Sequence, residues 1–322
     1  MKESIIKSKL SISALNIGAG TPTDAGMSYR GETTHPNPIQ IAGGIPDFPT
    51  LPISDFTQML EHASLEETEG SYNYGGWFGY DGLREQIAKR QTILDSKKLT
   101  LNNFIVHNGS SGALENVCKT LLDPEDVVIV EQPSYSGTVR AIRGFNCDVV
   151  EVKMNNDGID IPELKSTILN LKNKGKNIKF IYTIPDFHNP TGILTSDKVK
   201  AELCEISSSE DIFIVEDATY SELYFNGNQP TPLFSLDDND KVIKLGTFSK
   251  IISTGIRVGW IQAHESIIQA CSQTRFDMGN SPLIHRALSL YLSTNLLEDH
   301  VTSMRNIYRK KMEYFTENLL LK

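Results

Sequence analysis

One lysine follows an apolar run and is surrounded by groups that bind anions. In "GTFSKIISTGIRVGW", residues 246–260, Thr247 and Ser249 precede Lys250, and Arg257 follows it by seven positions. An amine beside a second cation loses its proton more readily, and a free amine can attack a carbonyl carbon to form a Schiff base. Arg257 could clamp a phosphate through its fork of N–H donors. Two cations in one pocket therefore indicate an anionic ligand.

The segment "NGSSGAL", residues 108–114, leads from an apolar run into a helical pattern. At the start of that helix the backbone N–H groups of Ser110, Ser111 and Gly112 would be unpaired and would point at an anion. An ordinary helix start has the same composition, so this segment alone leaves both interpretations open. It is not a P-loop, because no Gly-Lys-Ser/Thr follows.

Other polar residues follow apolar runs elsewhere in the chain. Asp217 ends the run in "IVEDATY", where an unpaired carboxylate is costly, so it is either paired within the protein or serves a positive nitrogen of a ligand. "HNPTG", residues 188–192, has the composition of a turn, which Asn189 could simply cap. Tyr135 and Tyr220 could lie in the core or at the edge of a site. Taken singly, none of these residues decides the chemistry.

Seven short apolar runs, rich in β-branched residues, predict strands that are buried on both faces. Helical patterns lie between many of them, which predicts an α/β protein with three α/β/α layers around a mainly parallel, seven-stranded sheet. About ten residues separate the last two runs, too few for a parallel crossover, so we expect the last strand to be antiparallel. Ligands of such sheets bind at the carboxyl ends of the strands. The runs begin at Asn103, Val127, Asp148, Ile178, Ile212, Val242 and Arg257.

The chain of 322 residues exceeds the usual ~100–200 residues of one domain, so we expect a large domain and a smaller unit. Residues 1–50 are predicted to form an N-terminal arm, and residues 51–280 the large domain. Residues 281–322 would form an interdomain helix and the start of a small, incomplete second domain. Ser281 and Pro282 have the composition of a helix start, and no stop signal follows the helical pattern that ends at Leu319.

The composition is that of a globular protein, with 39% apolar and 22% charged residues. A formal charge of −9 without a long basic run argues against nucleic acid and anionic lipid as partners and favours small molecules. The four cysteines are widely spaced and no His cluster has metal-ligand spacing, so we expect no metal site and reduced thiols in a cytoplasmic compartment. Neither an export signal nor a membrane span is indicated.

Seven motifs in a fixed order resemble the pyridoxal-phosphate enzymes of fold type I, specifically the class I/II aminotransferase family. Each motif is weak alone, whereas the ordered set is specific and covers about residues 39–300. The resemblance extends to the branch that includes 2-aminoadipate and kynurenine aminotransferases. The motifs are "IAGGIPDFPTLP", "YNYGGWFGYDGLRE", "NGSSGAL", "EQPSYSGT", "PDFHNPTG", "VEDATY" and "GTFSKIISTGIRVGW".

This resemblance implies pyridoxal 5'-phosphate as cofactor and transamination between an α-amino acid and a 2-oxo acid, within amino acid metabolism and biosynthesis. Lys250 would hold the cofactor as a Schiff base and then move the substrate's α-proton, while Asp217 would keep the pyridine nitrogen protonated. Asn189 and Tyr220 would hydrogen-bond the ring oxygen, and Tyr135 would stack on the ring. Lys250, Asp217 and Tyr220 are the expected catalytic residues. The phosphate would be held by Ser110, Ser111, Gly112, Thr247, Ser249 and Arg257.

The resemblance also implies a homodimer with shared active sites, because Tyr74 matches a tyrosine that reaches the phosphate of the neighbouring subunit. Gly44 matches a glycine beside the substrate, and Arg30 and Asn189 are further candidates for substrate binding. Family members usually extend further, and the arginine that grips the substrate's carboxylate lies in the part beyond Lys322. We therefore expect a truncated form that binds the cofactor weakly and turns over amino acids slowly.

Three other functions stay open at this stage. A pyridoxal-phosphate lyase or cyclase uses the same lysine and aspartate, but it needs no keto-acid acceptor. A ligand-sensing module of a transcription regulator can have this fold, joined to an N-terminal winged helix whose pattern the arm lacks. A truncated protein that binds the cofactor and has little activity is the third possibility.

Overall fold

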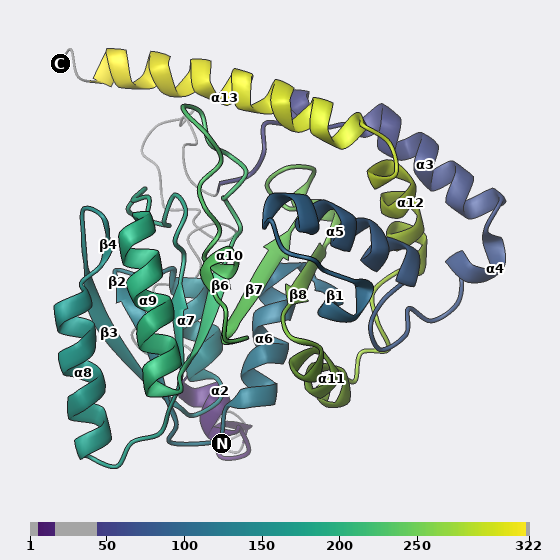
Figure 1. The fold of residues 1–322 in the computed structure, drawn as a ribbon. Helices are drawn as coiled ribbons and strands as arrows, with labels where there is room; N and C mark the ends of the chain where they lie inside the picture. Colours follow the sequence, from purple (N-terminus) through teal and green to yellow (C-terminus); the bar gives the residue numbers. More distant parts are fainter. Residues whose placement is uncertain (1–5, 17–43, 320–322) are drawn as a thin grey trace.

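The computed structural model describes residues 6–16 and 44–319, in which eight strands form one sheet (Figure 1). Across the sheet the strands follow the order β1-β8-β7-β6-β5-β2-β3-β4. All seven predicted strands are present, and the inner ones are buried along their length, as is typical of a sheet covered on both sides. The strands are β1 (Phe104–Asn108), β2 (Val127–Gln132), β3 (Asp148–Asn155), β4 (Gly158–Ile159), β5 (Ile178–Thr183), β6 (Phe213–Asp217), β7 (Val242–Thr247) and β8 (Val258–Gln262).

Strand β8 runs against both of its neighbours, β7 and β1, which confirms the predicted antiparallel last strand. The pairs β2–β3, β2–β5, β5–β6 and β6–β7 are parallel, as expected for strands joined through helices. Strand β4 was not predicted. It consists of two residues that pair antiparallel with β3, too few to form an apolar run of strand length.

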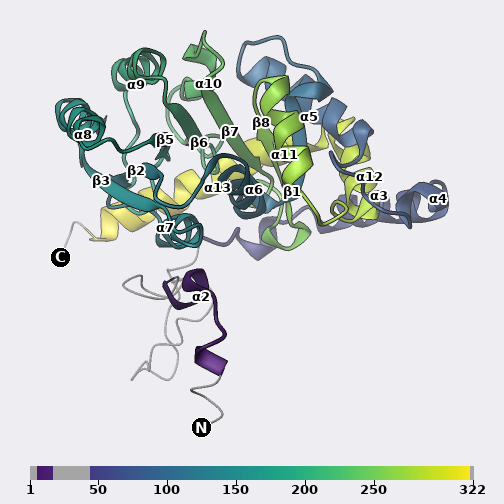
Figure 2. The ribbon, with the colours of Figure 1, turned by 90° about the horizontal axis from the view of Figure 1, so that it is seen from below.

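Helices cover both faces of the sheet, which confirms the three-layer architecture (Figure 2). One face packs against α6 (Gly109–Leu121), α7 (Ser136–Arg143) and α11 (Glu265–Thr274). The opposite face packs against α8 (Ile161–Asn173), α9 (Asp197–Glu210) and α10 (Leu233–Leu236). Near β1 and β8 that second face is covered by α5 (Asp81–Leu94) and α12 (Pro282–Leu292).

The last helix, α13 (Leu296–Leu319), extends along one end of the sheet (Figure 1). Its apolar stripe is buried only in the first part, at Leu297, Val301 and Met304, whereas Phe315 is 53% exposed. The division of the chain at residues 50 and 280 stays a prediction. No helix in the described ranges combines the length and apolarity needed to cross a membrane. The remaining elements are α2 (Ile12–Asn16), η1 (Phe48–Thr50), α3 (Ile53–Leu65), α4 (Thr68–Ser71), η2 (Leu101–Asn103) and η3 (Thr254–Ile256).

A buried ion pair ties α5 to the centre of the sheet. Lys244 on β7 donates from Nζ to Asp95 Oδ1 at 2.5 Å and to Gln91 Oε1 at 3.1 Å. Gln262 on β8 donates to the other oxygen of Asp95 at 2.7 Å. All four side chains are at most 4% exposed. Both charges of the pair are therefore hydrogen-bonded, and removal of one member would leave a buried charge alone.

We predict that Lys244→Met lowers the free energy of unfolding by about 3–5 kcal/mol, because the buried carboxylate of Asp95 would lose its cationic partner. Urea unfolding followed by circular dichroism measures this change. Lys241→Met is the matched control, since Lys241 pairs with the exposed Asp211 at the surface, where such pairs contribute little. Equal losses in the two variants would contradict the assigned role of the buried pair.

Candidate active site

A cavity of about 590 Å³ lies at the carboxyl ends of the central strands and beside the start of α6. This is the edge at which ligands of open α/β sheets bind. Ile45, Ile184, Thr219, Thr254 and Gly255 complete its lining. Ten predicted site residues also line it: Ser110, Ser111, Tyr135, Asn189, Asp217, Tyr220, Thr247, Ser249, Lys250 and Arg257.

Lys250 follows β7 and directs its ammonium group into this cavity. Its Nζ donates to the carbonyl oxygen of Gly44 at 2.8 Å and lies 5.8 Å from the centre of the Tyr220 ring. Burial lowers the pKa of Lys250, and the charge of Arg257 lowers it further, while the carboxylate of Asp217 opposes both. The amine therefore releases its proton more readily than an ordinary lysine, which a nucleophile requires.

Asp217 presents its carboxylate at the end of β6, and three donors hold it. Its Oδ2 accepts a hydrogen bond from the Tyr182 hydroxyl at 2.7 Å. Its Oδ1 accepts from the Thr219 amide at 3.1 Å and from the Thr219 hydroxyl. Burial raises the pKa of Asp217, and these hydrogen bonds and Lys250 act against that rise. The sequence is compatible with a paired or a ligand-binding carboxylate, and Asp217 both has hydrogen-bond partners and lines the cavity.

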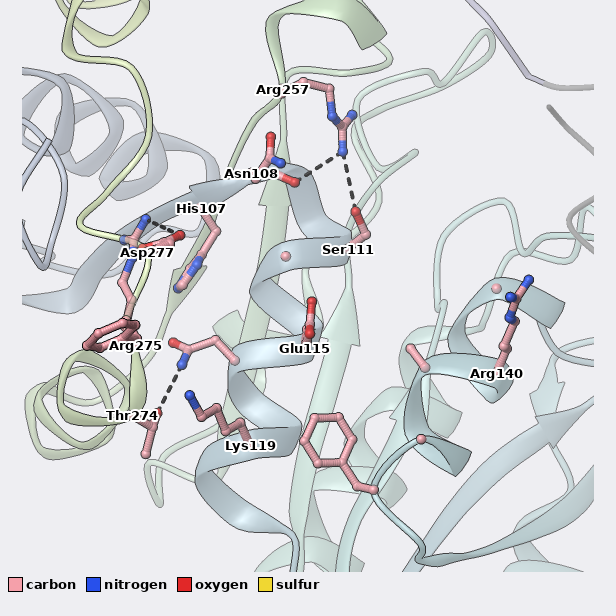
Figure 3. A pocket seen from close by; sticks show the side chains of 17 residues that line it. His107, Asn108, Ser111, Glu115, Lys119, Arg140, Arg257, Thr274, Arg275 and Asp277 are labelled. Carbon is pink, nitrogen blue, oxygen red and sulfur yellow. Dashed lines mark hydrogen bonds and ion pairs between the residues drawn. The ribbon is translucent and has the colours of Figure 1, made fainter. Parts of the chain in front are cut away.

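Arg257 closes the other end of the cavity together with the first turn of α6. Its Nη2 donates to the carbonyl oxygen of Asn108 at 3.1 Å and to Ser111 Oγ at 3.3 Å (Figure 3). The guanidinium lies so close to Gly109 that a Cβ there would come within 2.6 Å of Nη2. Gly109 also has a φ of +75°, a conformation that side chains disfavour. A helix N-terminus, with its unpaired N–H groups, and a guanidinium thus face the same space.

Hydroxyl and amide groups line the walls between these two ends. Thr247 Oγ1 and Ser249 Oγ are hydrogen-bonded to each other at 2.9 Å. Asn189 Nδ2 donates to the hydroxyl of Tyr220 at 3.4 Å, and burial raises the pKa of that tyrosine. Tyr135 lines the cavity with 38% of its surface exposed.

Three further predicted residues do not line the cavity directly, and a fourth cannot be placed relative to it. Gly44 contacts it through the hydrogen bond from Lys250. Gly112 faces an adjoining cavity instead, and Tyr74 is 77% exposed and lies outside both linings. Arg30 lies outside the described residues.

The adjoining cavity, of about 910 Å³, shares Ser111 and Arg257 with the first (Figure 3). It lies along the side of α6 and is lined by three further cations, Lys119, Arg140 and Arg275. Arg275 donates to the carbonyl oxygen of Trp77 at 3.2 Å, so the backbone at Trp77, three residues after Tyr74, lies beside this cavity.

Sequence reasoning missed two residues that hold Asp217. Tyr182 belongs to the apolar run of β5 and is fully buried, so nothing in the pattern separates it from a core residue. Thr219 is two residues beyond Asp217, a spacing typical of side chain to backbone turns, and that signal could have indicated its role.

Comparison with known proteins shows which family this chain resembles. Residues 38–320 match the family described as "Aminotransferase class I and II". The aromatic-amino-acid aminotransferase 1 of Thermococcus litoralis is 27% identical over 277 residues, 85% of this chain and 66% of the relative. The 2-aminoadipate transaminase of Thermus thermophilus is 29% identical over 285 residues, 87% of this chain and 69% of that enzyme.

Similarity also extends to solved structures and to proteins of another kind. A crystal structure of Pyrococcus horikoshii kynurenine aminotransferase in complex with PMP has a TM-score of 0.88 at 27% identity, covering 99% of this chain and 78% of that one. The HTH-type transcriptional regulator YisV of Bacillus subtilis is 29% identical over 235 residues, which are 72% of this chain and 47% of the regulator. The chain thus spans between about half and three quarters of the length of such curated relatives.

The family match covers most of the chain, and relatives from the kynurenine and 2-aminoadipate branch are among the similar proteins, as the motifs predicted. The chain belongs to the class I and II aminotransferase family, whose cofactor is pyridoxal 5'-phosphate.

Proposed function

We propose that this chain catalyses pyridoxal-phosphate-dependent transamination between an α-amino acid and a 2-oxo acid. The observation that carries the proposal is the arrangement of one cavity, with the amine of Lys250, the carboxylate of Asp217 and the guanidinium of Arg257 in its lining. These three groups have the chemistry to meet three different parts of the cofactor. Family membership supports the same activity.

The residues fit pyridoxal phosphate part by part. Arg257 and the N–H groups at the start of α6 suit a phosphate, and the absence of a side chain at Gly109 makes room for the guanidinium. Asp217 suits a protonated ring nitrogen, and the amine of Lys250 suits an aldehyde. We assign the phosphate to Ser110, Ser111, Gly112, Thr247, Ser249 and Arg257, of which Gly112 would contribute through the helix rather than by contact.

Bound pyridoxal phosphate supplies an aldehyde that bonds covalently to amines and a protonated ring that draws electrons from the substrate's α-carbon. Lys250 would hold the cofactor through Nζ, and its free amine would take up the substrate's α-proton at Nζ and return it as general acid. Asp217 keeps the ring nitrogen protonated through its carboxylate. Asn189 and Tyr220 hold the ring oxygen, and Tyr135 covers one face of the ring.

The substrate would lie beside Gly44, whose carbonyl oxygen already accepts a hydrogen bond from Lys250 Nζ. Attachment of the cofactor to Nζ would replace that contact and leave the carbonyl oxygen of Gly44 available to the substrate. Asn189 is a second candidate for contact with the substrate, and Arg30 is a third.

We also propose a homodimer in which Tyr74 of one copy reaches the phosphate site of the other. Tyr74 is 77% exposed, and Phe276, at 85% exposure, lines the cavity that shares Arg257 with the active site. Exposed aromatic side chains beside a cavity next to the active site are typical of a surface that is covered by a second copy of the chain. We further propose a cytoplasmic location, which the four free cysteines support. A role in amino acid biosynthesis is proposed from the family membership alone.

The similarity to HTH-type regulators favours a second candidate, a ligand-sensing module that binds pyridoxal phosphate. Both candidates need Lys250 and Asp217, so the cofactor site does not separate them. Turnover separates them, since a sensor needs only to bind its ligand.

We predict that addition of a suitable amino acid converts the absorbance of the loaded protein to that of the pyridoxamine form, and that a 2-oxo acid restores it. A panel of amino donors with 2-oxoglutarate as acceptor, followed spectroscopically, measures both half-reactions. Product release that needs no 2-oxo acid would identify a lyase or cyclase. Binding with no conversion for any donor would favour the sensor or a protein with little activity.

The lowered pKa of Lys250 gives a pH dependence in the protein without cofactor. We predict that acylation of Lys250 by acetic anhydride, quantified by mass spectrometry, has a midpoint below the ordinary lysine pKa of 10.5. Because Asp217 favours the charged amine, Asp217→Asn should lower the midpoint further, whereas Arg257→Leu should raise it. Shifts of the opposite sign would show that these charges do not act on Lys250.

A further inference from the structure

A fully buried hydroxyl lies behind the carboxylate of Asp217. Tyr182 is 0% exposed, and its hydroxyl is 2.7 Å from Asp217 Oδ2. Thr138, on α7, is 4% exposed and donates from Oγ1 to the same hydroxyl at 2.9 Å. The three groups form a chain that runs from α7 through β5 to the end of β6.

The direction of these hydrogen bonds follows from the donors that are present. An ionised carboxylate can only accept, so Tyr182 must donate its single proton to Asp217. Its oxygen is then free to accept, and Thr138 supplies the proton for that bond. Burial raises the pKa of Tyr182 well above its ordinary value, so the hydroxyl keeps its proton and remains a donor.

The two oxygens of Asp217 are not equivalent. Oδ1 accepts two hydrogen bonds, both from Thr219, and each carboxylate oxygen has about two acceptor positions. Oδ2 accepts only from Tyr182 among the described residues. Oδ2 is therefore the oxygen with a position left for a ligand that enters the cavity.

We propose that Tyr182 is a positioning residue for the reaction, which aims Asp217 Oδ2 at the ring nitrogen of the cofactor and keeps that oxygen charged. This inference rests on the proposed function and adds Tyr182 and its support Thr138 to the residues that control the ring nitrogen. A phenylalanine would fill the same space in the core, so a tyrosine is needed here only for its hydroxyl.

The hydroxyl of Tyr182 stabilises the charged form of Asp217, which burial disfavours. Burial raises the pKa of Asp217, and the bond from Tyr182 is one of the contributions that lower it. Other groups that bear on this pair are Lys250, which favours the charged carboxylate, and Glu131, whose charge opposes ionisation of Tyr182. Loss of the hydroxyl would leave Asp217 protonated over a wider pH range and less able to accept from a ring N–H.

The test compares pyridoxal phosphate with an analogue that has a CH group in place of the ring nitrogen. Affinities of both for the wild-type chain and for Tyr182→Phe are measured by absorbance titration. We expect Tyr182→Phe to weaken pyridoxal phosphate binding about threefold to tenfold, because Asp217 would be held less well in the orientation that accepts from the ring N–H. The analogue, which makes no bond to Asp217, should bind the variant no more weakly than the wild-type chain.

Matched variants exclude a general loss of packing. Tyr291→Phe removes the hydroxyl of another fully buried tyrosine, on α12, which contacts a backbone carbonyl away from the cavity, and it should change neither affinity. The double variant Tyr182→Phe/Thr138→Val removes both buried hydroxyls. Even if Tyr182→Phe alone folds poorly, the double variant should bind pyridoxal phosphate more weakly than the wild-type chain and bind the analogue equally well. Thr138→Val alone keeps the bond to Asp217 and should have a smaller effect than Tyr182→Phe.

Equal weakening of both ligands by Tyr182→Phe, or no weakening of either, would overturn the proposal. A half-reaction that is slower in Tyr182→Phe, by a factor similar to the loss of pyridoxal phosphate affinity, would support the proposal independently. Failure of the wild-type chain to bind pyridoxal phosphate at all would instead refute the proposed function, so the two failures are distinguishable.

Discussion

The site depends on the close approach of α6 to the backbone of β8. A Cβ at Gly259 would come within 2.5 Å of the backbone of Gly109, so only glycine allows the helix start to lie directly on the strand. The antiparallel course of β8 places Arg257 at the same edge of the sheet as the carboxyl end of β7. The helix N-terminus, Arg257 and Lys250 consequently face one cavity, and a ligand with an anionic group is needed to balance them.

Strand β6 presents one carboxylate to this cavity and another to the opposite face of the sheet, where the charge of Lys244 acts on it. Successive residues of a strand point to opposite faces, so Glu216 and Asp217 serve different environments. Glu216 accepts from the backbone amides of Leu233 and Phe234 at 3.0 and 2.9 Å, and burial raises its pKa to about 7. Asp217 faces the cavity instead. The same short strand therefore fixes the core beneath α10 and presents the carboxylate that the chemistry needs.

Much of this arrangement could be predicted from the sequence because it depends on local patterns. The apolar runs predicted seven strands, and the short connection before Arg257 predicted that the last strand is antiparallel. The strand-end positions of Lys250, Asp217 and Asn189 placed them at one edge of the sheet, since parallel strands share that edge. Strand β4 was missed because two residues carry no periodic signal. Tyr182 was missed because its role depends on a contact between β5 and β6, and spatial contacts of this kind leave no trace in the apolar pattern.

The central claim is that Lys250 is the residue to which pyridoxal phosphate attaches. Borohydride reduction of the chain after incubation with pyridoxal phosphate fixes the attached group permanently, and proteolysis with mass spectrometry then locates it. We expect the pyridoxyl group on the peptide that contains Lys250, and none in the Lys250→Ala variant. Incorporation at a different lysine, or equal incorporation in the variant, would contradict the account.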